Sequence, residues 1–298
     1  MGGSIFVPLR GRETWPVAIR YVLQALQTVA RVVRERPDAV LVTNPPFVSG
    51  IVLVPLRRAL GFSLWCDAHS GAFNDPRWAR FARANAWLMR RCDGVIVTDR
   101  RLAVRVEEAG ARPLLLNWWV EEPVERSSEQ AFLIAPLTYS FDEPVHQLLA
   151  SARLVPQVTI VLTGLAPEDV RRVAPANCVF TGWLSRDDYE ERLRCARGLV
   201  GLTTREDTMQ LSAQEGLQHG LPMVLSGTEL LRDFFSAGGV VFADGHDPEP
   251  LAAALRELWE DHEQLSRAML VAREEIYDRC RAELDGLRAA LGVQPPTP

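Results

Sequence analysis

Two acidic residues stand eight positions apart in the stretch Thr203–Thr228 of this 298-residue chain. Asp207 falls in a polar turn after an apolar strand pattern, and Glu215 falls inside a helical stretch from about Met209 to His219. This spacing puts both carboxylates on one side of the helix, with Asp207 at its mouth. Carboxylates there accept hydrogen bonds from the vicinal hydroxyls of a ribose or hexose, and helix N-terminal amides favour a phosphate. The pair fits a sugar linked to a diphosphate; a capping Asp with an ordinary surface Glu is the structural alternative.

A second polar pair follows the strand pattern Ser63–Asp67. Asp67 ends the strand and His69 lies in the loop after it, where open α/β sheets bind their ligands. The histidine could donate a hydrogen bond to a sugar hydroxyl, and Asp67 could act as the base for a hydroxyl acceptor. The alternative is an Asx-type turn with a histidine that only packs.

Strand and helix patterns alternate along the chain and are interrupted once, by the polar linker 121–130. We therefore expect an α/β protein with two doubly wound, Rossmann-like domains, at 1–120 and 131–275, facing each other across a cleft. The cleft is the default ligand site. Residues 276–298 are expected to form a terminal helix and tail, with packing back onto the first domain as an option.

The expected strands are short, apolar and rich in β-branched residues. They are Ser4–Leu9, Ala39–Thr43, Ser63–Asp67, Gly94–Thr98, Pro113–Leu116, Phe132–Ala135, Val158–Leu162, Val179–Thr181, Leu199–Leu202, Met223–Leu225 and Val240–Phe242. The clearest helices between them are Trp15–Glu35, Val48–Leu60, Arg77–Arg91, Arg101–Ala109 and Pro248–Leu291, the last with a break near His262. Trp15–Glu35 is a basic amphipathic helix, expected to cover the sheet, with a position on a membrane surface as the alternative.

Charge is divided unevenly between the two halves. Residues 1–120 hold 17 arginines against 9 acidic residues, a net charge of +8, and residues 121–298 hold 16 against 29, a net charge of −13. This division suggests domains with different partners, the first meeting an anionic acceptor or an anionic membrane surface. A solvated arginine-rich face is the simpler alternative.

Several protein classes are not supported. The sequence has no G-x-G-x-x-G, P-loop or G-x-S-x-G motif, which argues against a dehydrogenase, a P-loop NTPase and an α/β-hydrolase. The five cysteines are dispersed and no clustered His/Cys set is present, so we expect reduced thiols and neither a metal nor another cofactor. We see no signal peptide, membrane span or nucleic-acid-binding feature.

The segment Asp207-x7-Glu215, followed by His219-Gly220-Leu221-Pro222, resembles the E-x7-E segment of GT-B glycosyltransferases of the group 1 type. In that family the second acid holds the nucleotide ribose and the first lies near the donor sugar and phosphates. The resemblance thus implies that Glu215 is the ribose acid and Asp207 the donor-sugar acid. Asp in place of the usual first Glu shortens its reach.

Other segments carry the same resemblance. Phe180–Ser185 is similar to the strand end whose backbone contacts the nucleobase, which implies that Gly182, Trp183 and Leu184 lie at the base. Val161–Gly164 is similar to the strand that ends in a glycine at the cleft. Pro37–Pro46 and Asp67-x-His69 resemble a branch similar to the eukaryotic β-mannosyltransferase of dolichol-oligosaccharide assembly.

Two departures from the family bear on the site. The usual first strand and acceptor-facing glycine-rich loop are missing before Trp15, which predicts a reduced first domain or a truncated start. The usual Arg and Lys for the diphosphate are missing after Leu133–Pro136. The phosphate charge would then be met by Arg205, by backbone amides at a helix start, or not at all. Thr208, in the same turn as Arg205, is a further candidate for donor binding.

The resemblance implies a metal-independent hexosyltransferase that uses a UDP- or GDP-linked sugar and a hydroxyl acceptor, either lipid-linked or anionic. Retention and inversion of configuration both stay open. A non-catalytic sugar-nucleotide-binding partner of another transferase and a GT-B-fold sugar-nucleotide epimerase are the alternatives. We expect a cytoplasmic protein, with peripheral contact at the inner membrane as an option.

Overall fold

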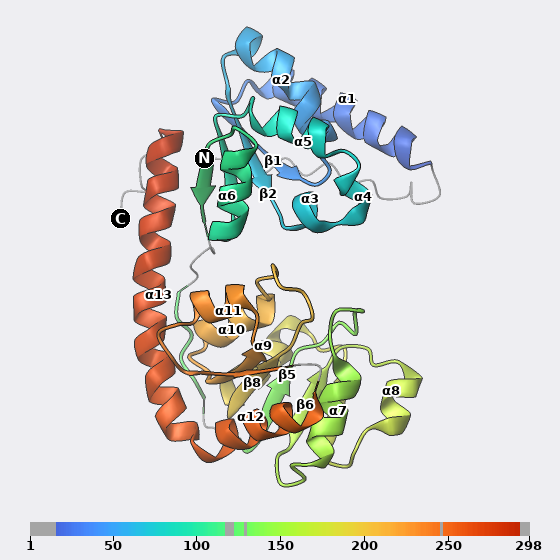
Figure 1. Cartoon of the computed structure of the whole chain (residues 1–298), viewed down its shortest axis with the longest axis vertical. Helices are drawn as coiled ribbons and strands as arrows, with labels where there is room; N and C mark the ends of the chain where they lie inside the picture. The colour runs from blue at the N-terminus through green and yellow to red at the C-terminus, as the bar shows by residue number, and fades with distance from the viewer. Residues whose placement is uncertain (1–15, 117–121, 128–129, 245–246, 293–298) are drawn as a thin grey trace. The chain divides into compact units, whose positions relative to one another are not determined.

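The computed structural model describes residues 16–116, 122–127, 130–244 and 247–292, so the expected strand Ser4–Leu9 lies outside it. The chain forms two compact units, Met1–Asn117 with Glu283–Pro298, and Trp118–Ala282. Each contains one parallel sheet with helices packed on it (Figure 1). The expected α/β class with two parallel-sheet domains is confirmed. Within the described residues, no helix is long and apolar enough to cross a membrane.

The first unit holds a four-stranded sheet in the order β1-β2-β3-β4. Its strands are β1 Ala39–Asn44, β2 Ser63–Ala68, β3 Gly94–Val97 and β4 Pro113–Leu115. Its helices are α1 Val17–Glu35, α2 Val48–Leu60, α3 Gly71–Asn74, α4 Pro76–Ala79, α5 Ala82–Met89 and α6 Arg100–Glu108. All strand pairs are parallel, so their carboxyl ends lie at one edge of the sheet.

Both faces of β2 and β3 are buried, as expected for a parallel sheet covered on two sides. Cys66 and Val95 share one apolar cluster with helix residues such as Leu102. On the opposite face, Trp65 and Ile96 pack against Leu287. Leu287 belongs to the last helix of the chain, which contributes its final turns to this unit.

The second unit holds a six-stranded parallel sheet in the order β10-β9-β8-β5-β6-β7. Its strands are β5 Leu133–Ala135, β6 Ile160–Thr163, β7 Cys178–Gly182, β8 Gly198–Gly201, β9 Met223–Ser226 and β10 Val240–Ala243. The chain runs outward from β5 to β7, then returns to the other side of β5 and runs outward again from β8. The strand order therefore reverses between β5 and β8, where doubly wound sheets bind ligands.

The described helices of the second unit are α7 Val145–Arg153, α8 Glu168–Val173, α9 Arg186–Cys195, α10 Leu211–Gln218, α11 Glu229–Phe234, α12 Pro248–Glu260 and α13 His262–Leu291. The last of them, α13, begins in the second unit and ends in the first. α7 and α12 lie side by side and bury Leu149 and Leu255 on one face of the sheet (Figure 1). Leu217 of α10 and Met269 of α13 belong to the cluster on the other face.

Two local expectations need correction. The helix expected at Arg77–Arg91 is split, because Phe81 breaks it and packs its ring on Phe47 and Trp78. The loop expected after Asp67 contains α3. Within the described residues of the expected linker 121–130, the N–H of Val124 donates a backbone hydrogen bond of 3.1 Å to Gln218.

Candidate functional site

The loops after β5 and β8 meet at the point where the strand order reverses. The backbone N–H of Thr204 donates to the carbonyl of Asp142 at 2.8 Å. The hydroxyl of Thr203 lies 3.4 Å from the Asp142 carboxylate, and Arg205 Nε lies 3.8 Å from it. Asp142 therefore joins the two loops and sets the backbone that carries Arg205.

The loop after β5 is organised by a second carboxylate. Glu143 accepts hydrogen bonds from the backbone N–H and hydroxyl of Thr138 and from the N–H of Ser140, at 3.0–3.2 Å. These bonds fold residues 138–143 into a compact turn. Asp142 and Glu143 were not among the predicted site residues, although a Thr and a Ser shortly before two acids is a pattern typical of side-chain-to-backbone bonding.

Arg205 is the basic side chain of this region that the sequence singled out. Its guanidinium lies over the ring of Phe141, 4.9 Å from the centroid, and its side chain is 53% exposed. Phe141 itself is 86% exposed. The contact holds a solvent-facing cation beside the joined loops, where an anionic ligand could reach it.

The two glycines that end β6 and β7 are paired. The N–H of Gly164 donates to the carbonyl of Gly182 at 3.0 Å, and both have positive φ, +82° and +72°. A Cβ on Gly164 would collide with the carbonyl oxygen of Leu137, whereas one on Gly182 would meet open space. Gly164 thus allows the close approach of the β5 loop. Trp183 follows Gly182 with 79% of its surface exposed, and Leu184 is half-buried.

α10 begins later than the sequence predicts, at Leu211. Gln210 is held extended, with φ −80° and ψ 135°, and its side-chain amide donates to the carbonyl of Leu202 at 3.0 Å. Asp207 and Thr208 consequently lie in the turn before the helix, and Asp207 is not at the helix mouth. The two acids therefore do not share one helical side, which corrects the predicted geometry.

Glu215 lies in the second turn of α10 and is half-buried. Its Oε2 accepts a hydrogen bond of 2.6 Å from the hydroxyl of Tyr189 on α9. Burial, reinforced by the negative charge of Glu215, raises the pKa of Tyr189 far above its ordinary value, so this hydroxyl stays protonated. Tyr189 was not singled out in the sequence, because nothing in its local pattern indicates contact with a residue 26 positions later.

Asp67 and His69 lie at the carboxyl end of β2 in the first unit. His69 Nε2 is 3.2 Å from Asp67 Oδ2, and the His69 side chain is 56% exposed. More than half of the His69 side chain is therefore open to solvent. The hydrogen bond to Asp67 raises the pKa of His69 above its ordinary value, and partial burial opposes the increase.

The His69 loop rests on a buried amide pair. The N–H of His69 donates to the carbonyl of Asn44 at 2.9 Å. The Asn44 amide donates to Asn85 at 2.6 Å, and the Asn85 amide donates to the carbonyl of Ala72 at 3.0 Å. Asn85 was missed by the sequence analysis, although an asparagine on the inner face of an otherwise apolar helix is the available signal.

The predicted donor-side residues all belong to the second unit: Gly164, Gly182, Trp183, Leu184, Arg205, Asp207, Thr208 and Glu215. Of these, Gly164 and Gly182 are in direct contact. Asp67 and His69 form a separate pair in the first unit. Across the described residues, no group of three or more His, Cys, Asp or Glu side chains is placed to hold a metal ion.

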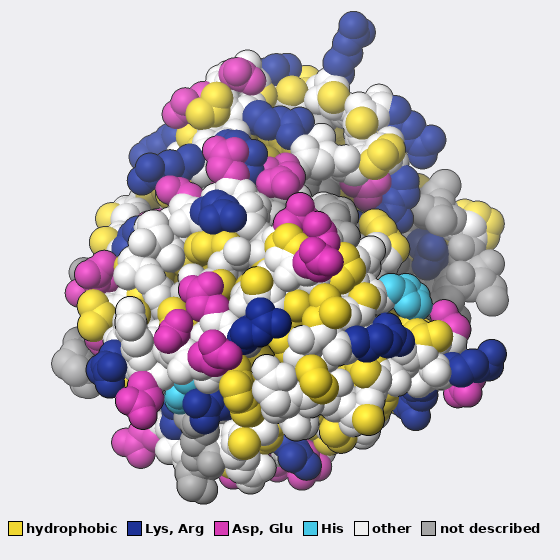
Figure 2. Space-filling model, turned by 60° about the horizontal axis from the view of Figure 1, so that its bottom comes forward, with side chains coloured by type: hydrophobic (Ala, Val, Ile, Leu, Met, Phe, Trp, Pro, Cys, Tyr) yellow, Lys and Arg dark blue, Asp and Glu magenta, His cyan; other side chains and the backbone are white. Residues whose placement is uncertain are grey.

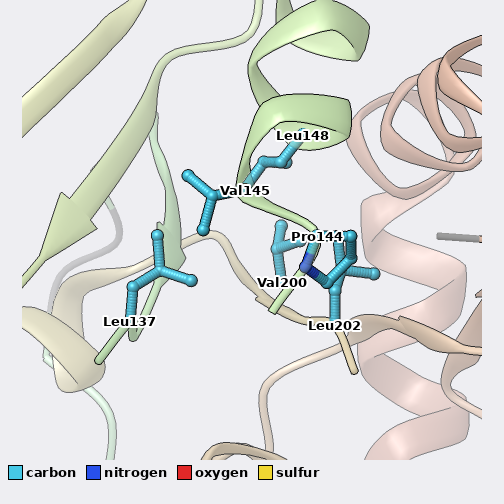
Figure 3. A pocket seen from close by; sticks show the side chains of 6 residues that line it. All are labelled: Leu137, Pro144, Val145, Leu148, Val200 and Leu202. Atoms are coloured by element: carbon cyan, nitrogen blue, oxygen red, sulfur yellow. The ribbon is translucent and has the colours of Figure 1, made fainter. Parts of the chain in front are cut away.

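A small hollow lies beneath the joined loops (Figure 3). It is lined by Leu137, Pro144, Val145, Leu148, Val200 and Leu202. These apolar side chains offer no partner for sugar or phosphate oxygens. The hollow is therefore a packing gap among apolar side chains under the loops and not a polar ligand site.

Comparison with known proteins places both halves in one class. Residues 5–116 match the family model of a glycosyl transferase 4-like domain, and residues 136–261 match that of the glycosyl transferases group 1. Together the two models span most of the chain. A search of curated proteins gave no match in sequence.

Solved structures share the fold at low sequence identity. Sucrose-phosphate synthase from Thermosynechococcus elongatus superposes with a TM-score of 0.73 at 14% identity, covering 96% of this chain and 80% of that one. HepE from Anabaena, in complex with UDP and glucose, has a TM-score of 0.71 at 14% identity, covering 94% and 84%. The E. coli trehalose-6-phosphate structure bound with UDP-2-fluoro glucose has a TM-score of 0.69 at 12% identity, covering 93% and 79%. The chain is therefore a glycosyltransferase built from two domains, a glycosyl transferase 4-like domain at 5–116 and a group 1 domain at 136–261, with the two-sheet fold of these solved structures.

Proposed function

We propose that this glycosyltransferase moves a hexose from a UDP- or GDP-linked donor to a hydroxyl acceptor. The observation that carries the proposal is Glu215, a half-buried carboxylate on α10 that the Tyr189 hydroxyl holds at 2.6 Å. A carboxylate so fixed suits the hydroxyls of a nucleotide ribose. The UDP and glucose bound by HepE, and its complex with UDP-glucose, support a nucleotide-sugar donor and make UDP the first base to test.

The other second-unit residues are assigned around Glu215. The backbone at Gly182 and Leu184, with the exposed indole of Trp183, would receive the base. Gly164 would let the β5 loop approach the donor closely. Arg205 and Thr208 would meet the diphosphate, and Asp207 the donor sugar.

The reacting end is assigned to the first unit. Asp67 would take the proton from the acceptor hydroxyl while that oxygen bonds to the anomeric carbon. The bond from the anomeric carbon to the phosphate oxygen breaks, and the diphosphate leaves with the electron pair. His69 would donate a hydrogen bond to a donor-sugar hydroxyl. The leaving charge would be met by Arg205 and backbone amides without a metal ion.

Two measurements on the purified chain test this proposal. Melting temperature with UDP and with GDP tests donor binding, and we expect one of the two to raise it. Consumption of the matching sugar nucleotide, with and without added hydroxyl acceptors, tests transfer. Acceptor-dependent release of the diphosphate supports a transferase. Binding without turnover would indicate a partner subunit, and donor epimerisation without an acceptor would indicate an epimerase. No shift with either nucleotide would refute the site.

We further propose that the enzyme is cytoplasmic and that its first unit meets an anionic lipid surface, where a lipid-linked acceptor would lie. The support is an exposed apolar stripe on α1. Its members recur at helical spacing and are exposed by 43–61%: Ile19, Val22, Leu26 and Val33. The inner side of the same helix buries Ala25 and Val32. The helix therefore covers the fold with one side and presents apolar residues on another.

Charge favours lipid over a second copy of the chain as the occupant of this stripe. Arg20, Arg31 and Arg34 share the polar face beside it. Anionic headgroups would attract these arginines. Two copies of the chain that met through the stripe would instead bring the arginines of both copies together, and their like charges would repel. Figure 2 brings forward the part of the molecule at the bottom of Figure 1, and there basic, acidic and apolar side chains are interspersed. The lipid proposal depends on α1 alone.

A further inference from the structure

A hydrogen bond joins α9 to α10 at Glu215, the residue that the proposed function assigns to the ribose. Tyr189 is partly buried against the cluster that contains Leu217 and Met269, and only its hydroxyl oxygen needs a polar partner. That hydroxyl donates to Glu215 Oε2 at 2.6 Å, the short distance expected of a hydrogen bond to an ionised carboxylate. The bond fixes one carboxylate oxygen and so sets the plane of the group.

A second tie lies one helical turn further along α10. The side chain of His219 has no exposed surface. Its Nδ1 lies 2.8 Å from the carbonyl oxygen of Glu215, and its Nε2 lies 3.2 Å from Glu190 Oε2. Neighbouring residues of α9, Tyr189 and Glu190, therefore contact α10 at 215 and 219. Two adjacent residues of α9 thus contact both the Glu215 side chain and the C-terminal end of α10.

We propose that Tyr189 is the positioning residue of Glu215, so that ribose recognition depends on a side chain that does not touch the ligand. The terminal torsion of a glutamate is broad, because it joins a tetrahedral to a planar carbon. Loss of the tyrosine hydroxyl removes the bond to Oε2 and leaves the carboxylate less well ordered, so that part of the binding free energy would go into ordering it. This inference rests on the proposed function, because it takes Glu215 as the ribose acid.

The test compares a nucleoside diphosphate with its 2′,3′-dideoxy form by titration calorimetry on the full chain. The wild-type protein should bind the ribose form more tightly. Tyr189→Phe should weaken that form by up to about tenfold, the cost of ordering one side chain on binding, and leave the dideoxy form unchanged. In a Glu215→Gln background, Tyr189→Phe should add little, because the two residues act as one unit.

Tyr277→Phe is the matched control. Tyr277 is a fully buried tyrosine of the same apolar cluster, but it lies on α13. We expect its replacement to leave both ligands unchanged. If Tyr189→Phe weakens both nucleotides equally and lowers the melting temperature, the tyrosine has a structural role and the proposal is wrong. Unchanged discrimination between the two nucleotides in Tyr189→Phe would also reject it. If the wild type binds neither UDP nor GDP, the proposed function fails first and this inference with it.

Discussion

The two carboxylates assigned to the donor are held differently by the fold. Glu215 lies on a helix and accepts a hydrogen bond from a partly buried tyrosine. Asp207 lies in the turn between β8 and α10, because α10 begins only at Leu211. A carboxylate in a turn can follow a bound sugar more freely than one on a helix. Loss of Asp207 should therefore affect turnover of the sugar more than binding of the nucleotide.

Asp207→Asn tests this division. It should lower kcat for the donor while leaving the Kd for the bare diphosphate within about twofold, because the diphosphate lacks the hexose to which Asp207 is assigned. Glu215→Gln is the matched comparison and should weaken the bare diphosphate itself. A loss of diphosphate binding in Asp207→Asn comparable with that in Glu215→Gln would contradict the separate roles.

The titration of His69 provides a second test at this scale. Its pKa should lie above the ordinary value of about 6.5 and return towards it in Asp67→Asn, since the hydrogen bond to Asp67 is the main cause of the increase. Because the folded pKa is raised, the contact stabilises the fold at low pH and is lost as the pH rises through that pKa. Histidine proton shifts against pH measure this. Asp75→Asn, which removes the partner of Arg77, is the control. An unchanged His69 titration in Asp67→Asn would reject the pairing.

Positions near strand ends could be located from the sequence, whereas contacts with a distant neighbour could not. The strand-end glycines and the Asp67–His69 pair stand where strands end, and the alternation of strand and helix patterns locates these ends. Tyr189 was missed because its partner comes from another element, and the start of α10 was misplaced because Gln210 bonds to Leu202. Such tertiary contacts leave no signal at the spacing of a single helix or strand.

At the level of elements, the carboxyl edge of the second sheet is built from closely approaching backbones. Gly164 lies against the β5 loop, and Asp142 of that loop bonds to Thr204 after β8. Three neighbouring strand ends, β6, β5 and β8, are thereby connected. This edge should be rigid before any ligand binds, which reduces the entropy lost on binding.

Gly164→Ala and Gly182→Ala separate close approach from backbone conformation. Both residues have positive φ, so each substitution should cost about 1–2 kcal/mol in the free energy of unfolding. Only an added Cβ at Gly164 meets the Leu137 carbonyl, so that variant should lose about 1–3 kcal/mol more, as in overpacked sites. Urea unfolding followed by circular dichroism measures the difference. Equal losses would show that the β5 loop does not press on Gly164.

The elements were largely predictable because the strands are short apolar runs and the helices between them are amphipathic. The break at Asp261 between α12 and α13 falls beside the expected His262. The region after β2 was not predictable. Asp75 caps α4 through the N–H of Arg77, and the aromatic contacts of Phe81 separate α4 from α5, which outweighs the helical periodicity of 77–91.

For the molecule as a whole, the division of charge and the exposed stripe of α1 bear on where the enzyme works. The arginine-rich first half and the acidic second half were evident from the sequence. The stripe was not, because helical periodicity does not tell which apolar residues another element covers. That Leu287 of the last helix packs with Trp65 also could not be derived, since amphipathicity does not name a partner.

Vesicle sedimentation tests the lipid proposal. The chain should sediment with vesicles that contain anionic phosphatidylglycerol, bind less at high salt, and bind little to neutral phosphatidylcholine. The double variant Val22→Gln and Leu26→Gln should weaken this binding by about tenfold, because it removes apolar contact area. Val271→Gln, at an equally exposed valine of α13, should not. Binding unaffected by the double variant would exclude α1 as the contact.

The central claim is that Glu215 holds the ribose of a nucleotide-sugar donor. Titration calorimetry of UDP and GDP against the wild type and Glu215→Ala tests it most directly, with circular dichroism to confirm that the variant is folded. We predict that the wild type binds one of the two nucleotides and that Glu215→Ala binds it about 10- to 100-fold more weakly, the effect of losing a charged hydrogen-bond acceptor. Equal affinity of the two proteins, or no binding of either nucleotide by the wild type, would contradict the account.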